Sequence, residues 1–187
     1  MSICGNYMKQ KGTLKKNTIV ATVMSNLGMF LMGEREGIHI EKTKVGDRYV
    51  LENMLENGYN IGGEQSGHII FLDENTTGDG LLSALHLLQV MTETKKKLSE
   101  LASIMEVLPQ ALVNAKVPNH KKEHFEEYAE IAEAIAEVEA KFAGEGRVLI
   151  RPSGTEPLVR VMIEGKDQQL IESEAQKLAE LISSIML

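Results

Sequence analysis

The pattern of apolar and polar positions alternates between strand-like and helix-like segments over the first half of the chain. Short apolar or β-branched runs predict strands at 18–24, 38–43 and 69–72. Longer segments with helix start and stop signals predict helices at 1–12, 27–36, 48–56, 81–91 and 98–105. Because strands that alternate with helices build layered sheets, this part predicts an α/β domain with three αβα layers and a mixed sheet.

The pattern changes near Pro109. From there it predicts strands at 111–117, 147–150 and 158–163, and helices at 123–142 and 168–186. The first of these helices is expected to be one long helix, because its apolar residues recur at spacings of three and four. The β-α-β-β-α order predicts a smaller α+β domain. We place the first domain at 1–112 and the second at 113–187.

The richest candidate site is the heptad 151–157, Arg-Pro-Ser-Gly-Thr-Glu-Pro, with Arg160 following three residues later. Two guanidinium groups, two hydroxyls and a glycine that exposes backbone N–H groups supply many donors for a phosphate dianion. The heptad contains no nucleophile with an adjacent base. It therefore predicts a loop that holds phosphate without reacting with it, in preference to a turn whose arginines pair with surface acids.

A second candidate is the glycine-rich loop 62–68, Gly-Gly-Glu-Gln-Ser-Gly-His. Glu64 and Ser66 are two residues apart and project from the same side of an extended loop, where they suit the hydroxyls of a sugar. His68 adds a group that exchanges a proton near neutral pH. A β-turn that merely carries polar side chains stays open as the alternative.

Two further loops are weaker candidates. In 45–49, Gly46 and Asp47 bring Arg48 to the start of a helix, a place that favours an anion. We favour the alternative, in which Asp47 is the helix N-cap and Arg48 is solvated. In 76–80, Asp79 before an apolar helix is most simply explained as a helix cap.

Composition narrows the classes of function. Hydrophobic residues make up 43% and charged residues 25%, which is typical of a folded globular protein. A net charge of -7, with basic residues spread out except at 95–97, argues against nucleic-acid binding. No apolar run suits a membrane span, and a lone cysteine, Cys4, suits a reducing compartment, so we expect a cytoplasmic location. The acidic residues and the five histidines lack metal-ligand spacing, so no metal site is expected.

The loops at 63–68 and 151–157, in this order, closely resemble two motifs of the α-D-phosphohexomutase superfamily. The segments 45–49 and 77–80 look most like its bacterial phosphoglucosamine mutase branch, and the resemblance runs over essentially the whole chain. It implies a four-domain isomerase that interconverts glucosamine 6-phosphate and glucosamine 1-phosphate in amino-sugar metabolism, through a phosphoserine and a bisphosphate intermediate. This sequence would correspond to the third and fourth domains.

The resemblance also implies a role for each matching residue. Gly63, Glu64 and Ser66 would bind the sugar, and His68 would act as a general acid or base. The substrate-orienting loop would contain Gly46, Asp47 and Arg48. The phosphate that does not react would be held by Arg151, Ser153, Gly154, Thr155 and Arg160.

Two motifs of that superfamily do not occur in this sequence: the segment around the catalytic serine and the Asp-rich magnesium loop. We therefore expect the sequence to begin after the metal loop. Magnesium is expected as a cofactor of the full-length enzyme only, and this fragment alone is expected to be inactive. A homodimer of the full-length enzyme stays open. So do a glucose or mannose phosphate mutase and a non-catalytic sugar-phosphate-binding module.

Overall fold

A computed structural model describes residues 1–142 and 144–187. The chain folds as two compact units, Met1–Val107 and Leu108–Leu187. The division lies a few residues before the boundary at 112/113 expected from the sequence, because strand β5 (Gln110–Lys116) is paired from its first residue within the second unit. Over the described residues, no helix is long and apolar enough to cross a membrane.

The first unit contains a sheet of four strands in the order β2-β1-β3-β4. Its strands are β1 (Thr18–Thr22), β2 (His39–Thr43), β3 (Ile61–Gly63) and β4 (Ile69–Phe71). The central strand β1 runs parallel to β2 and β3, whereas β4 runs antiparallel to β3. The predicted mixed sheet is therefore confirmed.

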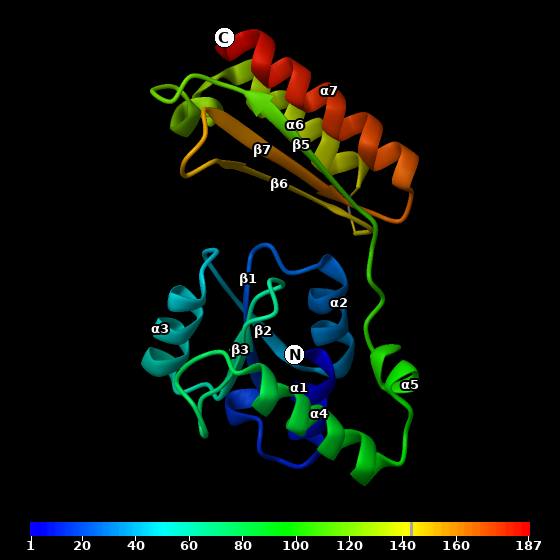
Figure 1. The fold of residues 1–187 in the computed structure, drawn as a ribbon. Coiled ribbons are helices and arrows are strands. Elements are labelled where there is room, and N and C mark those ends of the chain that lie inside the picture. Colours follow the sequence, from blue (N-terminus) through cyan, green and yellow to red (C-terminus); the bar gives the residue numbers. More distant parts are fainter. Residues whose placement is uncertain (143) are drawn as a thin grey trace. The chain divides into compact units, whose positions relative to one another are not determined.

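Helices cover both faces of this sheet (Figure 1). They are α1 (Ser2–Gln10), α2 (Leu27–Glu36), α3 (Asp47–Asn57), α4 (Gly80–Thr94) and α5 (Leu98–Ala102), with a short 3-10 turn at Lys15–Asn17. Successive residues of β1 point to opposite faces. Ile19 and Ala21 pack with residues of α1 and α2, while Val20 packs against Val50 and Met54 of α3. The three-layer αβα arrangement is confirmed.

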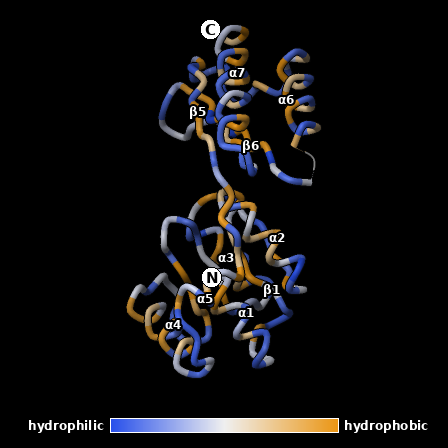
Figure 2. The backbone as a smooth tube through the Cα atoms, turned by 90° about the vertical axis from the view of Figure 1, so that its right-hand side faces the viewer, coloured by the Kyte–Doolittle hydropathy of each residue, from blue (hydrophilic) through white to orange (hydrophobic). Residues whose placement is uncertain are grey.

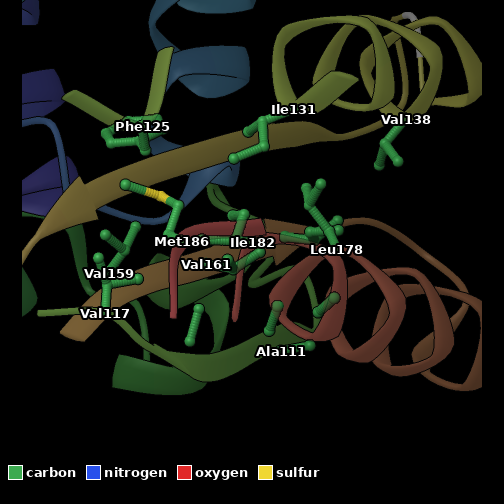
Figure 3. Packing of buried hydrophobic residues seen from close by; sticks show 14 of the residues in the cluster. Ala111, Val117, Phe125, Ile131, Val138, Val159, Val161, Leu178, Ile182 and Met186 are labelled. Carbon is green, nitrogen blue, oxygen red and sulfur yellow. The ribbon is translucent and has the colours of Figure 1, made fainter. Parts of the chain in front are cut away.

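The second unit is a three-stranded antiparallel sheet covered by two helices on one face. Its remaining elements are α6 (Ala129–Lys141), β6 (Arg147–Pro152), β7 (Leu158–Glu164) and α7 (Gln168–Met186). Val159 and Val161 of the central strand β7 pack against Ile131, Leu178 and Ile182 of the helices (Figure 3). Hydrophobic and hydrophilic stretches alternate along α6 and α7, as expected for helices with one buried face (Figure 2). The predicted α+β fold is confirmed.

The single long helix expected at 123–142 is wrong. A 3-10 segment at Lys122–Glu127 is followed by Tyr128 in an extended conformation, and α6 starts only at Ala129. Phe125 and Ile131 both pack into the same core, at 5% and 0% exposed. Packing on both sides of the break therefore overrides the helical periodicity.

Candidate functional site

The phosphate-loop candidate is the connection of the β6–β7 hairpin. Arg151 of β6 lies directly opposite Arg160 of β7 in the antiparallel register. Because Val159 and Val161 face the helices, Arg160 and its cross-strand partner lie on the other face of the sheet. Like charges that oppose each other across two strands destabilise a hairpin. The pair is therefore placed to favour an anion.

The two guanidinium groups differ in their partners. The Nε atoms of both are buried and have no hydrogen-bond partner among the described residues. Burial, and secondarily the charge of Arg160, holds the pKa of Arg151 below its ordinary value. Arg160 Nη2 donates to the exposed carboxylate of Glu156 at 3.1 Å. The alternative considered from the sequence, an arginine paired with a surface acid, therefore applies to Arg160. Arg151 has no ion pair in the part of the chain that is described.

The loop residues divide into one inward and two outward positions. Ser153 is only 2% exposed, its Oγ accepts the Glu156 N–H at 3.2 Å, and its own N–H donates to the Leu158 carbonyl. Gly154 and Thr155 are exposed at the tip. The Ser153 side chain therefore shapes the turn, and the two following residues are the ones that a ligand can reach.

Lys122, the first residue of the 3-10 segment Lys122–Glu127, contacts this loop, and the sequence did not predict the contact. It is 8% exposed, and its Nζ donates to the carbonyls of Ser153 at 2.5 Å and Glu156 at 3.3 Å. Lys122 is far from the heptad along the sequence. No local pattern links the two segments, so only the fold reveals the contact.

The sugar-loop candidate is the tight connection of the β3–β4 hairpin. The Glu64 N–H donates to the His68 carbonyl at 2.9 Å, and the Gly67 N–H donates to the Glu64 carbonyl at 3.2 Å. Gly67 has a φ of 101°, which favours glycine. A Cβ on Gly63 would collide with the carbonyl oxygen of His68. The glycines are therefore required for the hairpin itself.

Three side chains of this hairpin form one hydrogen-bonded chain. Ser66 Oγ donates to Glu64 Oε2 at 3.0 Å and lies 3.1 Å from His68 Nδ1. A carboxylate only accepts hydrogen bonds, so the single Ser66 proton points to Glu64. His68 Nδ1 must then be the donor to Ser66. In the neutral ring this leaves Nε2 unprotonated and able to accept a proton.

The 45–49 loop meets the sugar-loop candidate through its backbone. The Gly46 N–H donates to Glu64 Oε1 at 2.6 Å. Gly46 itself is the N-cap of α3, so the expectation that Asp47 caps the helix is wrong. Asp47 is already the first helical residue, and its carboxylate accepts the Arg48 N–H. Arg48 is solvated as expected, with 82% of its side chain exposed and Nε 2.7 Å from Glu52.

The fourth loop lies against the histidine. A Cβ on Gly78 would stand 3.2 Å from both Cβ and Cδ2 of His68, so the two residues are close neighbours. Asp79 Oδ1 accepts the N–H groups of Leu81 and Leu82, which confirms the helix-cap interpretation. Three loops of the first unit thus converge around Glu64 and His68.

Within 1–142 and 144–187, no group of three or more His, Cys, Asp or Glu side chains is arranged to hold a metal ion. The described residues therefore do not fit a magnesium site.

Comparison with known proteins connects both units to one family. Residues 1–108 match the family described as phosphoglucomutase/phosphomannomutase, alpha/beta/alpha domain III, and residues 112–181 match its C-terminal domain. The phosphoglucosamine mutases of Acetivibrio thermocellus and Ruminiclostridium cellulolyticum are 64% and 63% identical over 182 residues. These matches cover 97% of this chain but 40% of each relative.

A solved structure shows the same fold. Aspergillus fumigatus N-acetylphosphoglucosamine mutase, in complex with GlcNAc-6P and magnesium, superposes with a TM-score of 0.77 at 17% sequence identity. The superposition covers 100% of this chain and 42% of that chain. With both family domains matched in order and the fold shared, this chain belongs to the phosphoglucomutase/phosphomannomutase family.

Proposed function

We propose that this chain supplies the sugar-binding and phosphate-binding domains of a phosphoglucosamine mutase, an isomerase that interconverts glucosamine 6-phosphate and glucosamine 1-phosphate. The observation that carries the proposal is the opposed pair Arg151 and Arg160 beside an exposed glycine loop. Identity of 64% to a phosphoglucosamine mutase supports the choice of substrate.

The hairpin loop of the second unit holds a phosphate group. A dianion at Arg151 and Arg160 replaces their mutual repulsion with two charge-assisted contacts. The Gly154 N–H and the Thr155 hydroxyl add donors from the loop tip. Since no nucleophile with a neighbouring base is present in the loop, the phosphate held there is the one that does not react. A bisphosphate intermediate has one such group in each half-reaction.

The hairpin loop of the first unit binds the sugar and moves a proton. Glu64 and Ser66 keep lone pairs free beyond their mutual bond and accept hydrogen bonds from sugar hydroxyls. His68 Nε2 takes the proton of the reacting hydroxyl. The imidazolium that forms is stabilised through Ser66 by the Glu64 carboxylate. Gly46, which fixes Glu64 Oε1, links the orienting loop with Asp47 and Arg48 to the same carboxylate.

The phosphoryl donor and the magnesium ion are assigned to other parts of the enzyme. Magnesium neutralises the charge of a phosphoryl group during its transfer. None of the described residues of this chain is proposed as a ligand of magnesium. The partner expected for the chain is the sugar phosphate alone. A cytoplasmic location and a homodimer belong to the same proposal for the full-length enzyme.

Turnover by the full-length enzyme tests the proposal. The rates with glucosamine 6-phosphate, glucose 6-phosphate and mannose 6-phosphate are compared at equal concentration, with Arg151→Ala as the matched variant. We expect the highest kcat/KM with glucosamine 6-phosphate. Arg151→Ala should lower it on all three, since truncating one partner of a charged contact costs about 2–5 kcal/mol. Preference for glucose or mannose phosphate refutes the substrate, and an unchanged Arg151→Ala enzyme refutes the phosphate site.

A further inference from the structure

The phosphate-loop candidate rests on a buried cation. The Lys122 ammonium donates to two backbone carbonyls, those of Ser153 and Glu156, which lie near the start and the end of the loop. Both acceptors are uncharged, and Lys122 is 8% exposed. Burying an ammonium without a counter-charge is unfavourable. Stability alone therefore does not explain a lysine at this position, and its contacts connect it to the loop.

The contact with Ser153 also fixes the direction of a neighbouring donor. In a planar trans peptide the C=O and N–H groups point to opposite sides. Because the Ser153 carbonyl points to Lys122, the Gly154 N–H of the same peptide points away from Lys122. Ser153 Oγ closes the turn by accepting the Glu156 N–H. The exposed Gly154 N–H is thereby held in one orientation rather than left to rotate with the loop.

We infer that Lys122 is a positioning residue of the phosphate site, and this inference rests on the function proposed for the loop. It holds the Ser153 and Glu156 carbonyls inward, so that the Gly154 N–H is presented to the phosphate. Its charge also adds to those of Arg151 and Arg160 around an anion. Lys122 acts from beneath the loop and does not touch the phosphate itself.

The adjacent lysine provides a matched control. Lys121 Nζ donates to the carbonyl of Met186 at 2.8 Å, near the carboxyl end of α7. It is the same residue type, carries the same charge and also contacts a backbone carbonyl. Its contact, however, is with a helix end and not with the loop. Lys121→Met therefore controls for the loss of charge and for the loss of one tertiary hydrogen bond.

The test is an NMR titration of the 187-residue chain with inorganic phosphate, following the amide signals of Gly154 and Thr155. Lys122→Met should weaken phosphate binding about tenfold, the lower end of the loss found when an outer-shell partner of a metal ligand is removed. Lys121→Met should change the dissociation constant less than about twofold, because Lys121 Nζ contacts Met186 and not the loop. Lys122→Arg should restore most of the affinity, since a guanidinium also donates to two carbonyls.

The outcomes separate the inference from the function on which it rests. If phosphate shifts neither loop amide in the unmodified chain, the phosphate-binding function itself is refuted. If it shifts them and Lys122→Met binds as well as the unmodified chain, or Lys121→Met loses as much affinity, the positioning role is refuted. If Lys122→Met does not fold, the Nζ signal of Lys122 in the unmodified chain decides: phosphate must shift it, and an unchanged signal overturns the inference.

Discussion

Replacing Arg151 by methionine should stabilise the second unit and weaken its binding of phosphate. The substitution keeps most of the aliphatic stem and removes the guanidinium. It thereby removes a charge opposed to Arg160 and a buried Nε without a hydrogen-bond partner among the described residues. Both features are unfavourable in the absence of an anion, and both contribute to binding when one is present.

The magnitudes follow from the same contacts. A buried polar atom without a partner costs about 1–3 kcal/mol. A directly opposed like-charge pair in a sheet costs about 0.2–1 kcal/mol. Arg151→Met should therefore raise the free energy of unfolding of the second unit by about 1–4 kcal/mol. Phosphate binding should weaken by about 2–5 kcal/mol, which is at least about thirtyfold in the dissociation constant.

Native-state hydrogen exchange measures this stability in the second unit alone. The slowest amides of β7, such as that of Val161, report its global unfolding. Arg48→Met is the control, because Arg48 is exposed and lies in the first unit. In phosphate, the unmodified chain should gain protection at β7, and Arg151→Met should gain much less. A lower unfolding free energy for Arg151→Met, or undiminished phosphate affinity, would refute the reasoning.

Three further results are expected. Ser66→Ala removes the acceptor of the His68 Nδ1 proton, so ring-nitrogen NMR shifts should show the Nδ1–H tautomer losing its dominance; an unchanged tautomer contradicts this. Gly63→Ala should destabilise the chain by about 1–3 kcal/mol in urea denaturation, because its Cβ meets backbone; an unchanged midpoint argues against the collision. Lys11→Met should raise the pKa of Glu93, which the Lys11 hydrogen bond in particular lowers to about 2 from an ordinary 4.5. The Lys11–Glu93 contribution to stability is present above about 4.5 and is lost as the pH falls through about 2; an NMR titration in which the Glu93 pKa does not rise refutes it.

Elements with local start and stop signals were predicted well. The α2 helix occupies the predicted range, 27–36. Asn26 accepts the Gly28 N–H at its start, and Gly37, at a φ of 64°, ends it. The α7 helix likewise spans the predicted 168–186, with Asp167 accepting the Leu170 N–H. Helix caps and helix-ending glycines lie within a few residues of the helix that they start or end, so they can be recognised in the sequence.

Features that depend on distant contacts were not predicted. The break at Tyr128 arises from packing on both of its sides. The contact between Gly46 and Glu64 joins two loops that the sequence presents as separate candidates. Lys122 is far from the heptad along the sequence, yet it contacts the loop. In each case the stabilising contacts are made by residues that are neighbours only after folding. Hydrophobic periodicity and local propensity do not predict such contacts.

Unfavourable arrangements of charged side chains occur at the candidate phosphate site. Elsewhere in the second unit, for example, Glu174 accepts hydrogen bonds from Lys141 and Lys177, which carry the opposite charge. Beside the loop, by contrast, Arg151 opposes Arg160 and a lysine is buried on carbonyls. Each arrangement is unfavourable by itself, and one added anion would make both favourable. Because a natural chain keeps such arrangements mainly where they serve a ligand, the opposed arginines and the buried lysine favour this loop as a ligand site independently of any sequence motif.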